Sequence, residues 1–347
     1  MLGDWVSACA PGEFEKQAAM MLGINELLSF APQLTVDVVG ALVDHIPLIA
    51  IVVSEEQRRQ AVTLLSDWGL PAQQIHFVSM PVRGMWVRDY GPTFVRWSDG
   101  SITILDAEYP PADRPNDDKV PSAVAMLLKV PVAQVPITLE GGNLLTNGQG
   151  LCVTTWAIVE RNRRRGYDQH KVSRILSDYY GFYTGVYLAP LEDEKTGHAD
   201  MFASFVAPDV IVVGKFDPAI DAANAKVLDR NAEVLSGTKT RRGPLKVVRI
   251  PMPSNKDGIW RSYTNVVFAN GRLLVPSYPD QDPRVEEEAM DTYRQLLPSW
   301  KIIPIDCGAL IRQRGALRCV TLNIPWLTER FAMPDHRYVP TVTAMSA

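Results

Sequence analysis

The chain has 347 residues, a formal net charge of −4 and 46% hydrophobic residues, which is ordinary for a globular protein with a large core. The slight acidity gives no reason to expect nucleic-acid binding, since such sites are usually basic. The cysteines are spread along the chain without a Cys-x-x-Cys pair, so we expect free thiols and neither a zinc ribbon nor a disulfide scaffold. They are Cys9, Cys152, Cys307 and Cys319.

The ends and linkers of the chain give further expectations. Residues 1–14 lack a basic segment followed by a long apolar one, so we expect no signal peptide and a cytoplasmic location. The longest apolar run, residues 46–53, has the length of a strand and is too short to cross a bilayer. No linker or abrupt change of composition divides the chain, which predicts a single domain over residues 1–347.

Turn signals and apolar periodicity predict three kinds of element along the chain. Helices are expected at 54–70, 117–130 and 282–300; Ser54 is a plausible N-cap of the first helix. Hairpins are expected where Asp-Gly, Asn-Gly or Ala-Pro-Asp separates two β-rich runs, at 93–109, 143–159, 202–216 and 265–279. Single strands are expected at 74–80, 135–139, 186–191, 245–252 and 301–307.

The order of these elements is hairpin, helix, strand, about five times over. The repeats differ too much for a solenoid, in which one fixed period would be visible. The sequence therefore predicts an α/β fold in the form of a closed ring of ββαβ units, with loops that meet at the centre.

Trp86, Arg88 and Asp89 lie just before a predicted strand, with Gly91-Pro92 closing the turn. One interpretation is an Asx-type turn in which Arg88 neutralises Asp89. The other is a site for a flat cation, since an aromatic ring offers its face and a carboxylate offers paired acceptors.

His198 and Asp200 are separated by one residue, so they would share a face if the segment were a strand. A metal pair is one interpretation, but no second histidine or ligand-rich motif is near, and we expect no metal. A structural histidine and a catalytic histidine with a neighbouring carboxylate remain the other two.

Three further positions are ambiguous when each is taken alone. Glu140 precedes Gly141-Gly142, which suggests either a close approach of the backbone or a bulged strand start. Asn265 enters a hairpin and has the form of an ordinary turn residue. Cys319 would most often be a core residue, because free cysteine is among the most buried residue types.

The basic run at 160–166 is expected to be a solvated loop, or more weakly the rim of an anion site.

The order of the motifs is more specific than any one of them. Trp-x-Arg-Asp-x-Gly-Pro, Leu-Glu-Gly-Gly, Gly-His-x-Asp, Ser-Tyr-x-Asn and a late Cys-x-Thr follow one another between residues 80 and 325. This series resembles the family of agmatine deiminases and bacterial peptidyl-arginine deiminases, a branch of the guanidine-modifying enzymes. The resemblance implies a fivefold pseudo-symmetric α/β propeller, which agrees with the ring of ββαβ units.

The resemblance also implies roles for individual residues and no cofactor. Cys319 would be the nucleophile, Asp89 and Asp200 the carboxylates that hold the guanidinium, and His198 the general acid and base. Trp86, Arg88, Glu140 and Asn265 would shape the substrate pocket. The expected partner is a small molecule or peptide with a guanidino group, with no nucleic acid or membrane, while the sequence leaves the oligomeric state open.

Two local features bear on the substrate. Arg318 stands directly before Cys319, where the family often has histidine; its charge would either lower the thiol pKa or repel a cationic substrate. Residues 109–118 resemble the peptidyl-arginine side of the family, and Arg114 there would meet a substrate carboxylate, although Ala112 replaces a second arginine. The sequence therefore predicts deimination of a peptidyl or carboxylate-bearing arginine, with agmatine deimination, an amidinotransferase and a non-catalytic binding protein as alternatives.

Overall fold

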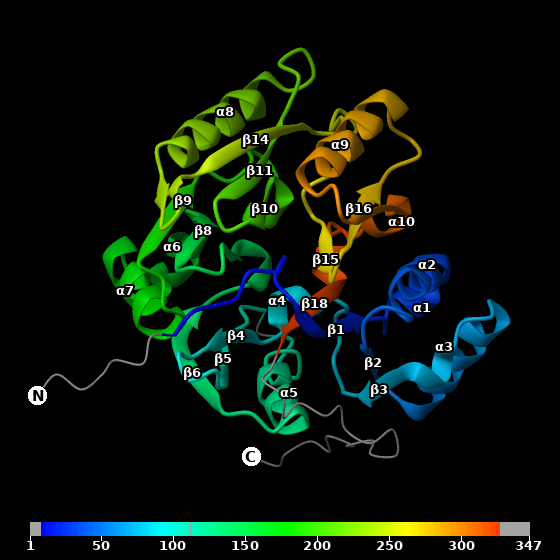
Figure 1. Cartoon of the computed structure of the whole chain (residues 1–347). Helices are drawn as coiled ribbons and strands as arrows, with labels where there is room; N and C mark the ends of the chain where they lie inside the picture. Colours follow the sequence, from blue (N-terminus) through cyan, green and yellow to red (C-terminus); the bar gives the residue numbers. More distant parts are fainter. Residues whose placement is uncertain (1–7, 112, 327–347) are drawn as a thin grey trace, which may run out of the picture.

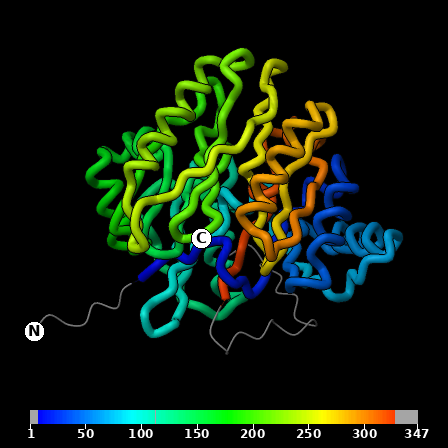
Figure 2. Tube along the Cα trace, turned by 45° about the horizontal axis from the view of Figure 1, so that its top comes forward, coloured from blue at the N-terminus to red at the C-terminus, as the bar shows by residue number. Residues whose placement is uncertain are grey.

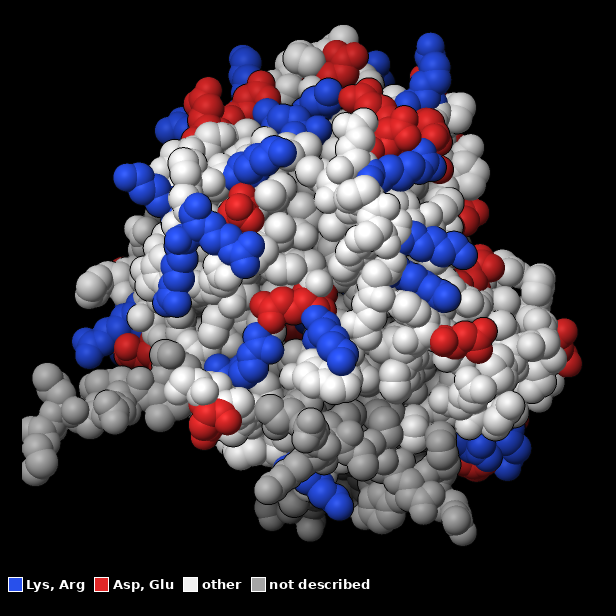
Figure 3. All heavy atoms as spheres, viewed as in Figure 1, with Lys and Arg blue, Asp and Glu red and all other residues white. Residues whose placement is uncertain are grey.

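The computed structural model describes residues 8–111 and 113–326. Figure 1 shows small sheets arranged around a centre, with most of the longer helices on the outside. On the same face, acidic and basic side chains are interspersed (Figure 3). The described part of the chain contains one four-stranded sheet, four three-stranded sheets and one two-stranded ribbon. No helix within the described residues is long and apolar enough to cross a membrane.

The first and last strands of the described chain share the four-stranded sheet. Its order is β18 (Thr321–Pro325), β1 (Gln17–Gly23), β2 (Leu48–Val52) and β3 (Ile75–Ser79). β1 pairs antiparallel with β18 and parallel with β2. The two ends of the described chain thus meet in one sheet, and Figure 2 shows the first and last segments side by side near the centre.

Each of the other four sheets is an antiparallel hairpin with a third, parallel strand. The second and third sheets are β4 (Thr93–Arg96), β5 (Ile102–Glu108), β6 (Val132–Thr138), and β7 (Leu145–Thr146), β8 (Leu151–Thr155), β9 (Thr184–Leu188). The fourth and fifth are β10 (Ala203–Ala207), β11 (Val210–Lys215), β14 (Lys246–Pro251), and β15 (Val267–Ala269), β16 (Arg272–Ser277), β17 (Lys301–Asp306). β12 (Lys239–Thr240) and β13 (Gly243–Pro244) form the ribbon.

A parallel third strand needs a crossover, and a helix supplies it in every sheet. These helices are α3 (Glu55–Asp67), α5 (Val120–Leu128), α6 (Ala157–Asn162) with α7 (Gln169–Tyr180), α8 (Ala222–Ser236) and α9 (Pro283–Leu296). The remaining helices are α1 (Leu27–Phe30), α2 (Pro32–Leu42), α4 (Val87–Tyr90) and α10 (Gly308–Ile311), together with five short 3₁₀ turns.

The sequence-based element predictions agree well with these bounds. The four expected hairpins are β4–β5, β7–β8, β10–β11 and β15–β16, and the five expected single strands are β3, β6, β9, β14 and β17. Ser54 caps α3 as predicted, since its side chain accepts a hydrogen bond from the Gln57 N–H. The expected hairpin at 143–159 is shorter than predicted, because α6 begins at Ala157.

Buried asparagines tie helices to the strands of the preceding sheet. Asn231 of α8 accepts from the Ala189 N–H at 3.0 Å and donates to the Ala189 carbonyl at 2.8 Å. Asn162 of α6 makes the same pair of bonds to Thr138, at the end of β6. Both side chains are buried, so each amide satisfies backbone groups that have little access to water.

Replacing Asn231 with alanine should therefore lower the free energy of unfolding by about 2–4 kcal/mol, because two polar backbone groups lose their partner. Urea unfolding followed by circular dichroism measures this. Ser66→Ala, on the exposed side of α3, is the control and should change stability by less than about 0.5 kcal/mol. Equal stability of Asn231→Ala and the parent protein would contradict the assignment.

Candidate active site

The loops that follow the third strand of each sheet carry the residues singled out in the sequence. They contribute Trp86, Arg88 and Asp89 after β3, Glu140 after β6, His198 and Asp200 after β9, Asn265 after β14 and Cys319 after β17. α4 packs against the 3₁₀ turns η2 (Gly141–Asn143) and η5 (Arg318–Val320), and η2 packs against η4 (Ala199–Met201). The carboxyl ends of the parallel strands thus point their loops toward one shared site.

His198 lies between two carboxylates and is buried. Its Nε2 is 3.1 Å from Glu140 Oε2, and its Nδ1 is 3.7 Å from Asp89 Oδ1. Burial disfavours the charged imidazolium, but Asp89 and Glu140 outweigh burial and raise the pKa of His198 to about 9. At neutral pH this histidine is therefore protonated and can donate a proton.

Asp89 faces the same histidine and is held by the backbone. Its Oδ1 accepts a hydrogen bond from the Gly142 N–H at 3.0 Å. Burial, helped by the negative charges of Glu140 and Asp200, raises its pKa to about 6, although His198 acts in the opposite direction. A β-carbon on Gly142 would lie 2.4 Å from His198 Nδ1 and 2.7 Å from Asp89 Oδ1, so only glycine fits between them.

Cys319 is buried in the middle of the turn η5, which leads into β18. Its Sγ lies 3.6 Å from Asn265 Nδ2, and Asn265 Oδ1 accepts from the Arg318 N–H at 2.8 Å. Burial, followed by the charges of Asp200 and Asp89, raises the pKa of the thiol well above its ordinary value, while Arg318 lowers it. The thiol is therefore neutral at neutral pH.

Asp200 is fully buried and has only one of its two oxygens paired. Arg318 Nη1 donates to Asp200 Oδ2 at 2.7 Å. Asp200 Oδ1 has no hydrogen-bond partner among the described residues, which is costly for a buried carboxylate unless a ligand supplies one. The Thr264 hydroxyl donates to the Asp200 carbonyl at 3.1 Å and fixes the backbone.

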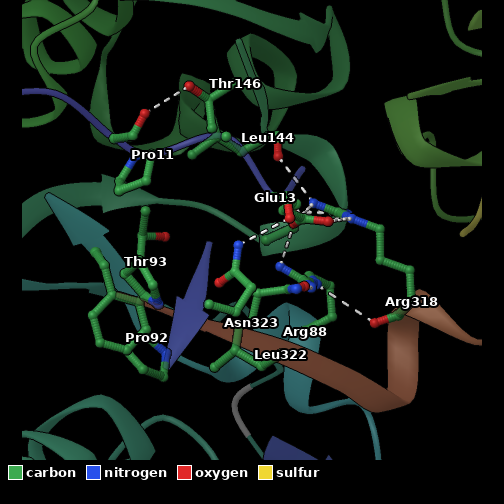
Figure 4. A pocket seen from close by; sticks show the side chains of 16 residues that line it. Pro11, Glu13, Arg88, Pro92, Thr93, Leu144, Thr146, Arg318, Leu322 and Asn323 are labelled. Carbon is green, nitrogen blue, oxygen red and sulfur yellow. Dashed lines mark hydrogen bonds and ion pairs between the residues drawn. The ribbon is translucent and has the colours of Figure 1, made fainter. Parts of the chain in front are cut away.

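Glu13 bridges two buried arginines, Arg88 and Arg318, next to these site residues. It accepts from Arg88 Nη1 at 2.7 Å and from Arg318 Nη2 at 2.9 Å, and Arg88 Nη2 also donates to Asn323 at 2.9 Å. Burial opposes the charge of Glu13, but Arg318 and Arg88 lower its pKa below the ordinary value. Figure 4 shows these side chains along a cavity of about 60 Å³, with Glu13 between the two guanidinium groups.

The structure decides three points that the sequence left open or predicted differently. Arg88 does not neutralise Asp89 through an ion pair. Its guanidinium donates hydrogen bonds to Glu13 and Asn323 and so holds these two residues next to the site. His198 and Asp200 do not lie on a strand, because they precede β10 in a loop and the turn η4. The run 160–166 is mostly exposed to solvent, as expected, but it is not a loop, since it ends α6 and forms the 3₁₀ turn η3 (Arg163–Arg165). Within it, Arg161 pairs with Glu140 at 2.6 Å.

Two other predicted residues lie at the margin. Trp86 packs over Gly315, where a β-carbon would be 2.2 Å from the indole ring, four residues before Cys319. Arg114 is not in a loop after a third strand; its Nη1 is 3.9 Å from Asp117 and its side chain is 30% exposed. Ala112 lies outside the described residues.

Glu13, Arg161 and Asn143 also hold the site together, and none of them was predicted from the sequence as a site residue. Asn143 Oδ1 accepts from the N–H groups of Thr155 and Ala199 and so joins η2 to η4. Their sequence signals are weak, because each side chain binds a partner that lies between 12 and 305 residues away along the chain. Among the described residues, no group of three or more His, Cys, Asp or Glu side chains has a metal-binding arrangement.

Comparison with known proteins identifies the class. The family described as Porphyromonas-type peptidyl-arginine deiminase matches residues 9–325, so the chain belongs to that family. It is therefore a hydrolase that acts on the C–N bonds of amidines.

Particular relatives support this membership. "Putative agmatine deiminase" of Yersinia pestis is 27% identical over 290 residues, 74% of this chain and 78% of the relative. "Putative agmatine deiminase 1" of Listeria monocytogenes is 26% identical over 364 residues, 91% of this chain and 96% of the relative. The structure of the "Putative Arginine Deiminase" from Porphyromonas gingivalis matches with a TM-score of 0.79 at 25% identity. The match covers 92% of this chain and 98% of the Porphyromonas chain. An agmatine deiminase of Enterococcus faecalis shares the fold, with a TM-score of 0.78 at 22% identity over 92% of this chain and 96% of its own.

The pKa of His198 gives a direct test of the site. Because it is raised from 6.5 to about 9, the stability from the charged imidazolium should be fully present below pH 6.5 and lost as the pH rises through about 9. NMR titration of the imidazole carbons measures the pKa. Glu140→Gln should lower it, and Glu56→Gln, far away on α3, should not. A His198 pKa near 6.5 in the parent protein would contradict the geometry.

Proposed function

We propose that this enzyme hydrolyses the guanidino group of a peptidyl or carboxylate-bearing arginine and releases ammonia and a citrulline-type ureido product. The observation that carries the proposal is the convergence of Cys319, His198, Asp89 and Asp200 from three different loops. A guanidinium is a delocalised, poor electrophile, so it needs carboxylates to orient it, a nucleophile at its carbon and an acid for its leaving nitrogen.

Binding of the substrate would also activate the nucleophile. The thiol pKa is raised by burial and by the carboxylates, so the thiolate is scarce in the free enzyme. A guanidinium held by Asp89 and Asp200 brings a positive charge close to Sγ and favours the thiolate. The acceptors available for its N–H groups include Asp200 Oδ1, which has no partner among the described residues.

The chemistry then proceeds in two balanced halves. The Cys319 thiolate attacks the guanidinium carbon, His198 gives a proton to one amino group, and the C–N bond breaks to release ammonia. The product of this half is a positively charged S-alkylthiouronium on Cys319. Water adds to its carbon while His198 takes back one proton, and the C–S bond breaks to give the ureido product and the free thiol.

Arg114 supports a substrate with a carboxylate. Its charge and that of Asp89 both act on the Tyr109 hydroxyl, whose pKa is raised mainly by burial; Asp89 adds to the effect and Arg114 opposes it. A β-carbon on Gly84 would lie 2.3 Å from Arg114 Nη1, so this partly exposed guanidinium lies against the loop that carries Trp86 and Asp89. An arginine at this position would bind a carboxylate and contribute nothing to agmatine, which has none.

A second basic region supports the same choice. The loops that carry Asp200 and Cys319 help enclose a cavity of about 200 Å³ lined by Lys195, Arg312 and Arg314, together with Asp193 and Glu194. Both oxygens of Glu194 accept hydrogen bonds from residues 196 and 197, and the lining as a whole carries three cations and two carboxylates. The exposed arginines would attract the carboxylate or acidic residues of an arginine peptide.

Agmatine is the second candidate substrate, because the names of relatives from Yersinia and Listeria specify it. An amidinotransferase would carry out the same first half and pass the amidino group to an amine. At the level of the fold, we propose that the five larger sheets are the blades of a fivefold pseudo-symmetric propeller and that residues 1–347 form one domain.

Replacing Cys319 with alanine should abolish ammonia release, with a fall of at least about 10⁴-fold, because no other described group is placed to form the covalent intermediate. The assay follows ammonia and ureido product from agmatine, free arginine, an N-acylated arginine and arginine peptides. The control is Cys307→Ala, which removes a buried thiol outside the site. Full activity of Cys319→Ala on the best substrate would contradict the proposal.

Replacing Arg114 with glutamine should raise KM for an N-acylated arginine about tenfold through the lost charge-assisted hydrogen bonds, and should leave KM for agmatine unchanged. Arg314→Gln tests the second basic region by the same comparison. The matched control is Arg249→Gln, an arginine paired with Asp229 far along the chain from these loops. Better turnover of agmatine than of any arginine compound would reject the carboxylate-bearing substrate.

A further inference from the structure

Arg318 is a buried cation that links a candidate substrate-binding carboxylate to the N-terminal segment. Its side chain is 4% exposed and makes ion pairs with Asp200 on one side and Glu13 on the other. Two carbonyls, those of Gly141 and Leu144, accept from the same guanidinium at 3.4 and 3.3 Å. Desolvation opposes this charge, but Glu13 and Asp200 raise the pKa of Arg318.

The charges of the site are balanced before any substrate binds. Four carboxylates (Glu13, Asp89, Glu140, Asp200) are paired with four cations (Arg88, Arg161, His198, Arg318) when His198 is protonated. Arg318 therefore does not improve the attraction of the site for a cation, and its charge alone would weaken it. A buried arginine beside a cation-binding carboxylate needs another reason to be there.

The geometry supplies that reason. Arg318 holds Asp200 Oδ2 at 2.7 Å, while Oδ1 of the same carboxylate is buried without a partner. A carboxylate anchored through one oxygen cannot rotate freely, so its other oxygen has a fixed direction. Glu13 binds the opposite edge of the Arg318 guanidinium through Nε and Nη2, which prevents the arginine from following Asp200 or the substrate.

We propose that Arg318 is a positioning residue: it fixes Asp200 through Oδ2 and presents Oδ1 alone to an N–H group of the substrate guanidinium, with Glu13 as its anchor. This inference rests on the proposed function. Specificity for the guanidinium then comes from the direction of a single oxygen, which Arg318 secures at the expense of some electrostatic attraction.

Alkylation of Cys319 separates position from charge. The measured quantity is the ratio of its rate with 2-chloroacetamidine, a planar cation, to its rate with neutral iodoacetamide. A change in the thiol pKa affects both reagents and cancels in the ratio. In Arg318→Gln, charge alone would raise the ratio, because a positive group is removed; lost positioning would lower it. We expect it to fall at least about tenfold, since a displacement of about 1 Å has effects of this size or more.

Two further variants and a control complete the test. Arg318→Lys keeps the charge but cannot bridge both carboxylates, and Glu13→Gln weakens the anchor, so both should lower the ratio to intermediate values. Arg261→Gln is the matched control: Arg261 is equally buried and paired with two carboxylates, Asp257 and Asp280, and its loss should leave the ratio unchanged. Circular dichroism establishes that each variant is folded.

The outcomes distinguish the inference from the function on which it rests. A parent protein that reacts equally with both reagents would contradict the proposed function and, with it, the role of Arg318. A parent protein that prefers the amidine, with ratios in Arg318→Gln and Arg318→Lys equal to or above the parent value, would overturn the positioning role alone. If Arg318→Gln does not fold, the ratio of Arg318→Lys, which keeps the charge, decides by the same criterion.

Discussion

The central constraint on this fold is the accumulation of four carboxylates where water is largely excluded. Asp89, Glu140 and Asp200 lie in loops that follow parallel strands, and Glu13 lies just before β1. Unpaired buried carboxylates would be too costly, so each one faces a cation or a backbone N–H. Asp89 faces the Gly142 amide and His198, and Glu140 faces Arg161 and His198. Asp200 and Glu13 both face Arg318. These partners come from different sheets. The charge network therefore holds the loops together as well as forming the site.

The same network raises the pKa of both reactive groups, and this has opposite effects on their reactivity. Carboxylates raise the pKa of His198 and so supply an acid, while burial and carboxylates also raise the pKa of the Cys319 thiol and keep it unreactive. A bound guanidinium would oppose the second effect, because its positive charge favours the thiolate. In our proposal the nucleophile becomes active mainly when a cationic substrate is present, which limits unwanted reactions of the thiolate.

The sequence predicted what is encoded locally. Asp-Gly and Asn-Gly turns, the Ser54 cap and short apolar runs fixed the hairpins, α3 and the third strands, and the five motifs indicated the residues that converge. It could not predict pairs made across the chain. Glu13 and Arg318 are 305 residues apart, and Arg161 lies in a basic run that looks like a solvated surface. His198 lies in a loop between Asp89 and Glu140. Local periodicity does not reveal this placement, because both carboxylates come from other loops.

The most direct test of the account is the identification of the covalent intermediate. The enzyme is mixed with its best guanidine substrate, quenched with acid within milliseconds, digested and analysed by mass spectrometry. Our account predicts an adduct on the peptide that contains Cys319, with the mass of the substrate less ammonia. Turnover with an adduct on another residue, or with no adduct under conditions that slow its hydrolysis, would contradict the central role of Cys319.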